Sequence, residues 1–364
     1  MNSDVVRSLT DPAVMFFALG LVVGLIRSNL EIPAPIAKFL SLYLLMALGF
    51  KGGQALRETG FSADALKVVS AALVLALVIP AVWFLVLRRR VNSFDAAAIA
   101  ATYGSVSAVT FVVASQFLAN QGVQAGGYLT VALVLMESPA IIMAVLLATW
   151  VRSHPTVLGG ESTPDAGRLA AIDVGTLVPE AQHRAGQVGP EESGHAAHGT
   201  PLSIRGVLRE AFTDGAHLLL LGSMLIGALS GDSGGKAMAP FTSGLFKGLL
   251  SFFLLEMGLL VARQLRQVRD VGVFLVGFGM VVPFVNAAAA LTLGWALGMT
   301  VGDLTLLAAL AASGSYIVVP AVIRYAIPEA RPSRYFTLAL GITFPINVAV
   351  GIPLYYAAAS SIAG

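Results

Sequence analysis

The stretch that decides the fold occupies residues 100–110 and reads Ala-Ala-Thr-Tyr-Gly-Ser-Val-Ser-Ala-Val-Thr. It lies inside an apolar run long enough to cross a bilayer, yet it is small, hydroxylated and interrupted by glycine. A similar stretch, Ala-Ala-Ser-Gly-Ser-Tyr, occupies residues 311–316 and is followed by Pro320. Backbone that leaves the helix inside a membrane is tolerated only where protein or a water-filled cavity satisfies its polar groups. Two such weak points at matching places in two halves of a chain predict the binding site of a transporter.

The composition is that of a membrane protein. Of the 364 residues, 57% are hydrophobic and 12% are charged, and the mean hydropathy is +0.83. That charged fraction is about half of the value typical of soluble domains, and several apolar runs reach the roughly 20 residues that span a bilayer as a helix. The runs are continuous rather than alternating, which favours helices over a transmembrane β-barrel. The chain has no cysteine, and its net charge of +2 gives no sign of a nucleic-acid partner.

Hydropathy predicts an all-α polytopic membrane protein with ten transmembrane helices. The predicted spans are residues 12–26, 34–50, 64–87, 94–118, 124–151, 208–230, 240–262, 271–298, 303–325 and 335–360. Spans one and two are short, which suggests tilted or partly buried helices. The fourth and the ninth contain the two Gly/Ser stretches, and we expect both of these helices to be broken there.

Basic residues in the loops predict the orientation. The arginine clusters at 88–90 and 263–269 fall on the inner side if the N-terminus is outside, so both termini are predicted outside. Residues 153–207 are rich in Gly, Pro, Glu, Ser and His and lack apolar periodicity, which predicts a largely disordered cytoplasmic linker. The four histidines of this linker match no metal-ligand spacing, so no metal site is predicted.

The linker separates two halves of five spans each, residues 1–152 and 208–364, which share an internal repeat. Matching segments lie 203 to 210 positions apart. They are Leu-Ser-Leu-Tyr-Leu-Leu (40–45) with Leu-Ser-Phe-Phe-Leu-Leu (250–255), Tyr-Leu-Thr-Val-Ala-Leu (128–133) with Tyr-Phe-Thr-Leu-Ala-Leu (335–340), Pro80 with Pro283, and Pro139 with Pro345. Because five spans are an odd number, the second copy is turned upside down, and the sequence predicts two inverted five-helix repeats.

Inverted repeats bring the two broken helices into the same plane of the membrane, where two half-helix N-termini meet. Their free N–H groups and dipoles favour an anion, and nearby hydroxyls and carbonyls offer oxygen ligands to a cation such as sodium. The predicted substrate site comprises Gly104, Ser105, Val106, Ser107, Gly314, Ser315 and Tyr316. The predicted ion site comprises Thr102, Thr110, Glu137 and Ser313. The competing interpretation is close packing of helices through small residues.

Glu137 is an ionisable group within span five, where a carboxylate is costly and faces a cavity, a partner or an ion path. It is a candidate cation ligand, protonatable coupling group or helix-packing partner, and Glu256 in span seven is the other buried candidate. Asn286 and Asn347 each follow a proline and either satisfy backbone that the proline frees or contact substrate. His217 is the only histidine near the bilayer, and the sequence has no nucleophile elbow, metalloprotease motif or P-loop. These features predict a secondary transporter and not an enzyme.

The chain resembles the cyanobacterial-type sodium-dependent bicarbonate transporter family over nearly its whole length. The resemblance rests on the joint order of Ile-Pro (32–33), Leu-Leu-Met-Ala-Leu-Gly-Phe-Lys-Gly-Gly (44–53), Gly-Ser-Val-Ser (104–107), Met-Glu-Ser-Pro-Ala (136–140), Ala-Ala-Ser-Gly-Ser (311–315), Gly-Ile-Pro-Leu-Tyr (351–355) and Ile-Ala-Gly (362–364). It implies two inverted repeats with a core part and a gate part, assembled as a homotrimer in the bacterial cytoplasmic (inner) membrane. It also implies sodium-coupled uptake of bicarbonate bound at the breaks, with no cofactor besides sodium. A small PII-like protein that binds the cytoplasmic face is the implied regulator.

The sequence departs from the family pattern in the second break. An aspartate follows the serine run in that pattern, and here Tyr316 takes its place. Losing a carboxylate is expected to weaken a sodium site or enlarge its apolar lining. Two alternatives therefore stay open: a permease for a small organic anion that Tyr316 contacts, coupled to sodium or protons, and a membrane-embedded binding or sensory scaffold that has lost transport.

Overall fold

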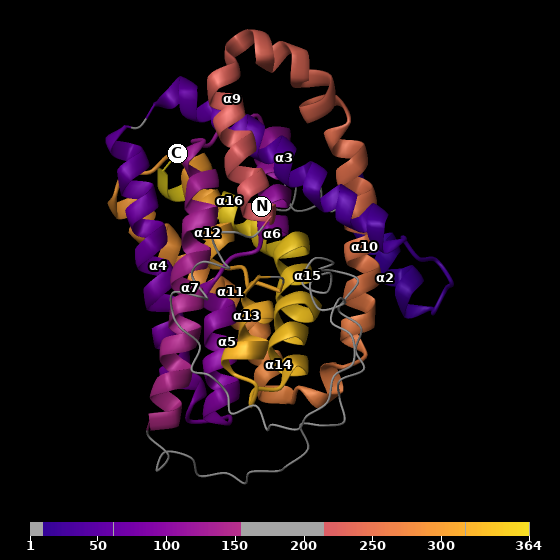
Figure 1. Cartoon of the computed structure of the whole chain (residues 1–364), viewed down its shortest axis with the longest axis vertical. Helices are drawn as coiled ribbons and strands as arrows, with labels where there is room; N and C mark the ends of the chain where they lie inside the picture. The colour runs from indigo at the N-terminus through magenta and orange to yellow at the C-terminus, as the bar shows by residue number, and fades with distance from the viewer. Residues whose placement is uncertain (1–9, 61, 154–214, 317, 364) are drawn as a thin grey trace, which may run out of the picture.

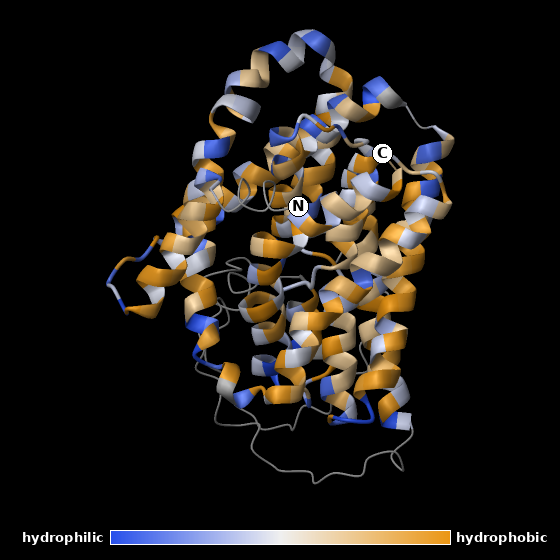
Figure 2. Cartoon of the chain, turned by 180° about the vertical axis from the view of Figure 1, so that it is seen from behind, coloured by the Kyte–Doolittle hydropathy of each residue, from blue (hydrophilic) through white to orange (hydrophobic). Residues whose placement is uncertain are grey.

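The computed structural model describes residues 10–60, 62–153, 215–316 and 318–363. Within these ranges every regular element is a helix (Figure 1). Hydrophobic residues run along the helices, and hydrophilic residues gather toward the two ends of the molecule (Figure 2). Helical segments that are long and apolar enough to cross a membrane are Ala34–Glu58, Ala63–Leu87, Ser93–Asn120, Tyr128–Ser153, Gly215–Leu265, Val273–Ala296 and Pro332–Ala363. The chain is therefore a multi-pass membrane protein.

The helices of the first half coincide with the five spans predicted there. They are α2 (Pro12–Leu25), α3 (Ala34–Thr59), α4 (Ala63–Leu87), α5 (Ser93–Gly104), α6 (Ala108–Asn120) and α7 (Tyr128–Ser153). The prediction of a short second span was wrong, because α3 continues past residue 50 and ends only before Gly60, which has a φ of 69°. Lys51 lies within this helix, and its ammonium lies 5.0 Å from the centre of the Phe246 ring, a cation–π contact.

The second half also follows the predicted spans. Its elements are α9 (Gly215–Ala239), η3 (Pro240–Gly244), α10 (Phe246–Leu265), η4 (Val268–Asp270), α11 (Val273–Ala296), α12 (Val301–Ala311), α13 (Val318–Ala326), α14 (Pro332–Phe336), η5 (Thr337–Thr343), α15 (Phe344–Ile346), η6 (Asn347–Gly351) and α16 (Ile352–Ala363). α9 passes its predicted end at residue 230 through a kink at Gly231, whose φ of 62° suits glycine. Apart from Ser153, the predicted linker at 153–207 lies outside the described residues.

Four helices form a layer at one side of the molecule: α2, α3, α9 and α10, called here the four-helix layer (Figure 1). Within it α2 packs against α10, and α3 packs against α9. In both pairs the two helix backbones come close to each other at a glycine. A Cβ at Gly20 would lie 2.1 Å from the carbonyl oxygen of Leu255, and one at Gly53 would lie 1.9 Å from that of Met224. Small residues of this kind let transmembrane helices touch backbone to backbone.

The remaining helices form the core bundle, which contains α4 to α7 and α11 to α16. Both broken helices, α5–α6 and α12–α13, belong to this bundle. In an apolar stretch of 18 residues within Ser93–Asn120, 94% of the residues are buried by protein. In the corresponding stretch of Ala63–Leu87 only 44% are buried. The first broken helix is therefore shielded from lipid by protein, which is the condition for non-helical backbone inside a membrane.

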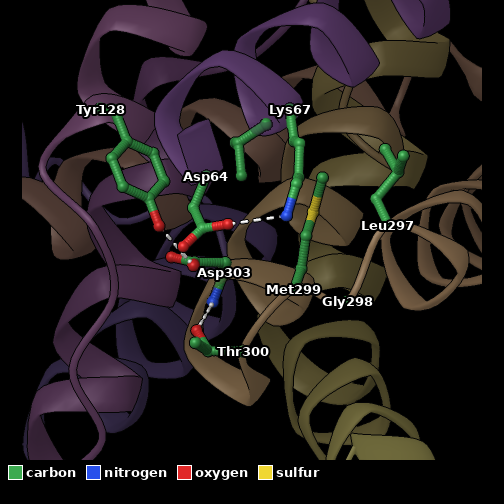
Figure 3. A pocket seen from close by; sticks show the side chains of 9 residues that line it. Asp64, Lys67, Tyr128, Leu297, Gly298, Met299, Thr300 and Asp303 are labelled. Atoms are coloured by element: carbon green, nitrogen blue, oxygen red, sulfur yellow. Dashed lines mark hydrogen bonds and ion pairs between the residues drawn. The ribbon is translucent and has the colours of Figure 1, made fainter. Parts of the chain in front are cut away.

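A buried aspartate anchors the start of each broken helix. Asp303, in the first turn of α12, accepts a hydrogen bond of 2.6 Å from the hydroxyl of Tyr128 (Figure 3) and one of 2.8 Å from the backbone N–H of Gly126. Asp95, in the first turn of α5, accepts bonds of 2.8 Å from the backbone N–H of Arg331 and from the guanidinium of Arg334. Each aspartate thus ties the beginning of one broken helix to the region where the last span of the other half begins.

Candidate binding site at the two helix breaks

The first break lies between α5 and α6. α5 ends at Gly104, where a Cβ would lie 2.6 Å from the ring of Pro80 in α4, so only glycine lets these two helices touch. Ser105 is extended, with φ −95° and ψ −176°. Ser107 caps α6, because its hydroxyl accepts a hydrogen bond of 3.1 Å from the backbone N–H of Thr110. The sequence prediction of a break at this Gly/Ser stretch is confirmed.

The second break lies between α12 and α13 and is built in a similar way. α12 ends at Ala311 and α13 begins at Val318. The hydroxyl of Ser315 accepts a hydrogen bond of 3.3 Å from the backbone N–H of Val319, in the first turn of α13. The hydroxyl of Ser313 donates a bond of 2.7 Å to the carbonyl of Leu310 and so holds the end of α12. The predicted break in the ninth span is therefore confirmed as well.

The two breaks are in direct contact, although they lie more than 200 positions apart in the sequence. The backbone N–H of Ser107 donates a hydrogen bond of 2.9 Å to the hydroxyl of Ser313. The backbone N–H of Ser315 donates one of 2.9 Å to the carbonyl of Thr102. The Ser107 hydroxyl also donates a bond of 3.3 Å to the hydroxyl of Tyr316. Each break therefore satisfies backbone groups that the other leaves open.

The predicted hydroxyl ligands differ in how they are used. The hydroxyls of Ser105 and Thr110 are buried, and neither has a hydrogen-bond partner among the described residues. The Thr102 hydroxyl instead donates a bond of 2.8 Å to the carbonyl of Ala98 within its own helix. A buried polar group without a partner costs about 1–3 kcal/mol. Ser105 and Thr110 are thus the two hydroxyls of the breaks that an incoming ligand would satisfy.

The lining of the breaks is otherwise apolar and aromatic. Val106 is buried, and Tyr316 is only 7% exposed. The ring of Tyr316 lies edge-on to Phe344 with a centroid distance of 5.9 Å. A Cβ at Gly314 would lie 3.3 Å from the Cβ of Ala339, so this glycine packs against the last span. An ion held here would be largely enclosed by protein.

Further polar side chains hydrogen-bond around the breaks, and the sequence singled out Asn347 among them but not Tyr355 or Thr343. Asn347, in the π-helical turn η6, donates a bond of 2.9 Å to the carbonyl of Ala312 and accepts one of 2.7 Å from the hydroxyl of Tyr355. Asn347 therefore satisfies backbone of the second break rather than backbone freed by Pro345. The hydroxyls of Tyr103 and Thr343 lie 2.6 Å apart. A polar residue inside an apolar run was the only signal for these positions.

Glu137 lies within α7 and is buried. Its carboxylate is paired with the imidazole of His217, in the first turn of α9. This pair joins the core bundle to the four-helix layer. The sequence did not predict that His217 would be the partner of Glu137. Asn286 accepts a bond of 2.8 Å from the indole N–H of Trp83. Glu256 in α10 is buried, and one of its carboxylate oxygens has no hydrogen-bond partner among the described residues.

A search of curated proteins found no match to the chain. The family model described as the Na+-dependent bicarbonate transporter superfamily, in contrast, matches residues 12–360. That match includes both helix breaks, the four-helix layer and the core bundle. The chain therefore belongs to the Na+-dependent bicarbonate transporter superfamily.

Proposed function

We propose that this protein is a sodium-coupled secondary transporter of a small anion, with bicarbonate as the first candidate. The observation that carries the proposal is the contact between two helix breaks in which Ser105 and Thr110 keep buried hydroxyls without a partner among the described residues. Membership of a transporter superfamily makes the chain a carrier and not an enzyme.

The substrate site that we propose lies between the starts of α6 and α13. Ser107 and Ser315 each accept a hydrogen bond from one first-turn N–H there. The first-turn N–H groups of Ala108 and Val109 in α6 and of Val318 in α13 have no partner within their helix, and Pro320, the third residue of α13, has no N–H. Those groups, with the positive ends of two helix dipoles, favour an anion. The hydroxyl of Ser105 supplies a further donor. The compact lining of Val106 and Tyr316 suits a small anion.

The sodium site that we propose uses oxygen ligands of the same breaks. Thr110 offers an unused hydroxyl, and Ser313 and Thr102 offer oxygen atoms that already join the two breaks. Small hard cations prefer such oxygen ligands. Tyr316 contributes a hydroxyl where the family pattern has a carboxylate, so the site carries less negative charge. Glu137 stays a predicted ligand or coupling group, although its described partner is His217.

The surrounding architecture that we propose is a pair of inverted repeats, residues 1–152 and 208–364, joined by a cytoplasmic linker at 153–207. The reciprocal anchors at Asp95 and Asp303, 208 positions apart, support this symmetry. We place both termini outside the bacterial cytoplasmic membrane. Assembly as a homotrimer and control by a PII-like protein rest on the family resemblance alone.

The proposal is tested by uptake of labelled bicarbonate into sealed proteoliposomes, with and without an inward sodium gradient. We expect uptake that needs sodium and that potassium at the same concentration does not support. Ser105→Ala is the site variant. Its matched control is Ser361→Ala, which removes an exposed hydroxyl near the end of α16. Absence of uptake by intact, monodisperse protein at any gradient would refute bicarbonate transport.

A second candidate is a proton-coupled permease for a small organic anion. The Glu137–His217 pair favours it, because a buried carboxylate beside an imidazole can bind and release a proton. Such a transporter would ignore sodium and lose uptake in Glu137→Gln. A non-transporting scaffold is the third candidate, and any turnover in sealed vesicles excludes it.

A further inference from the structure

A cavity of about 290 Å³ lies between the four-helix layer and the core bundle, apart from the breaks themselves. The layer contributes the start of α2 and the first half of α10, through residues such as Val14 and Leu254. The bundle contributes the last turns of α6, together with Val348 of η6 and Ile352 of α16. The cavity therefore lies where these two groups of helices face each other.

The rim of this cavity is polar and is bridged by a chain of hydrogen bonds. Gln116 donates a bond of 2.9 Å to the side-chain oxygen of Asn120, and Asn120 donates one of 2.8 Å to the carboxylate of Asp11. The other oxygen of Asp11 caps α2 by accepting a bond of 2.9 Å from Ala13. Lys247, at the start of α10, adds a cation to the same rim. The rim is therefore polar, and Asp11 and Lys247 give it one charge of each sign.

Helix register places the breaks one turn beyond the walls of this cavity. Along α6, Thr110 lies three residues before Val113, which lines the cavity, and so shares its face. Along α2, Phe17 lies three residues beyond Val14, and along the last span Phe344 lies four residues before Val348. Along α2 and α6, Phe17 and Thr110 lie farther from the rim residues Asp11 and Asn120 than the wall residues Val14 and Val113 do. The breaks and the cavity thus share one route.

Two aromatic rings close that route. Phe17 of the layer and Phe344 of the bundle meet edge to face with a centroid distance of 5.6 Å and an interplanar angle of 84°. Both are buried, with exposed fractions of 4% and 1%. Behind Phe344 lies the ring of Tyr316, whose hydroxyl contacts Ser107 of the first break. The two rings come from different groups of helices, so a movement of the layer against the bundle would change their contact.

We propose that the cavity is the access vestibule of an anion path, and that the Phe17–Phe344 contact is the gate between this vestibule and the breaks. This inference rests on the proposed function only for the identity of the cargo. The path itself is a property of the fold and can be tested without any transported substrate. Opening the gate exposes Thr110, whose hydroxyl has no partner among the described residues.

The natural absence of cysteine makes the gate directly testable in the full chain. Single cysteines replace Gln121 on the rim, Val113 on the wall and Thr110 beyond the gate, and a membrane-impermeant thiol reagent is added separately to each face of reconstituted vesicles. Gln121→Cys identifies the face that carries the rim. From that face we expect Val113→Cys to react readily and Thr110→Cys to react slowly.

Removing the gate is the decisive step. Phe17→Ala in the Thr110→Cys background is expected to raise the labelling rate about tenfold from the rim face, because a lost aromatic contact of this kind shifts a closed population by that order. Phe16→Ala is the matched control, since Phe16 is 43% exposed and adjacent in the same helix. Phe344→Ala tests the same gate from the bundle side, should Phe17→Ala fail to give monodisperse protein.

Equal labelling of Thr110→Cys with and without both phenylalanines would overturn the gate. Faster labelling from the opposite face would overturn the path. Neither result depends on bicarbonate or sodium, so failure of uptake in the earlier experiment and failure of this inference are distinguishable. Accelerated labelling with no bicarbonate uptake would keep the path and change only the cargo.

Discussion

The indole N–H of Trp83 donates a hydrogen bond of 2.8 Å to the side-chain oxygen of Asn286, and the two residues lie 203 positions apart. Pro80 and Pro283, which lie within α4 and α11, have the same separation. In two copies related by a two-fold axis, equivalent positions contact each other only near the axis. The Trp83–Asn286 contact is thus what two inverted repeats would produce, and it supports that proposal.

Ser105→Ala is expected to weaken substrate binding without weakening the fold. The Ser105 hydroxyl has no hydrogen-bond partner among the described residues, so removing it leaves none of their donors or acceptors without a partner. A hydrogen bond to an anion contributes about 1.5 kcal/mol or more, which corresponds to roughly a tenfold rise in KM. Uptake kinetics and thermal unfolding measure the two effects. Ser315→Ala is the contrasting variant, because it removes the hydroxyl that holds the first turn of α13 and is expected to lower Tm. An unchanged KM in Ser105→Ala would exclude this hydroxyl from the site.

Thr110→Val is expected to raise the sodium concentration needed for half-maximal uptake. Valine has nearly the shape of threonine, and the lost hydroxyl has no partner among the described residues, so stability should change little. Thr292→Val is the matched control, because Thr292 lies exposed on α11 and bonds only the carbonyl of Ala288 in its own helix. Sodium titration of uptake at saturating substrate separates the two variants. Identical titrations would place sodium elsewhere.

Asp303→Ala is expected to destabilise the protein by about 3 kcal/mol, because it leaves the Tyr128 hydroxyl and the Gly126 N–H without their acceptor. Asp303→Asn keeps an acceptor oxygen and should lose less. Asp64→Ala is the control, because Asp64 lines the same pocket as Tyr128 and Asp303 (Figure 3). Its ion pair with Lys67 is exposed and contributes below about 1 kcal/mol. Thermal unfolding in detergent ranks the three variants. Equal losses for Asp303→Ala and Asp64→Ala would show that Asp303 is no anchor.

Glu137→Gln is expected to lower Tm. The reason is that the Glu137 carboxylate is paired with His217 across the boundary between the bundle and the layer. His217→Gln should behave similarly, and the double variant should lose less than the sum of the two, because one interaction is removed twice. Stable Glu137→Gln protein without uptake would instead make this carboxylate a coupling group.

Several features of the site could be predicted from the sequence because they depend only on neighbouring residues. Glycine and serine in an apolar run weaken a helix wherever that run folds, so the breaks at Ser105 and Ser315 could be predicted. Other features depend on which residue comes to lie opposite. Nothing local tells Thr102, whose hydroxyl bonds its own helix, from Thr110, whose hydroxyl has no described partner. The pairing of Glu137 with His217 was missed for the same reason.

The sequence by itself determined the class of protein, the positions of its spans and the two places where helices break, because hydropathy and helix propensity act over one or two turns of chain. The tertiary structure alone decided that the two breaks touch, that Asp95 and Asp303 anchor them and that Phe17 meets Phe344. Those contacts join residues roughly 175 to 330 positions apart. The contacts of the breaks and of Asp95 and Asp303 come from packing within the core bundle, and the Phe17–Phe344 contact comes from how the four-helix layer packs on that bundle. No short stretch of sequence encodes either arrangement.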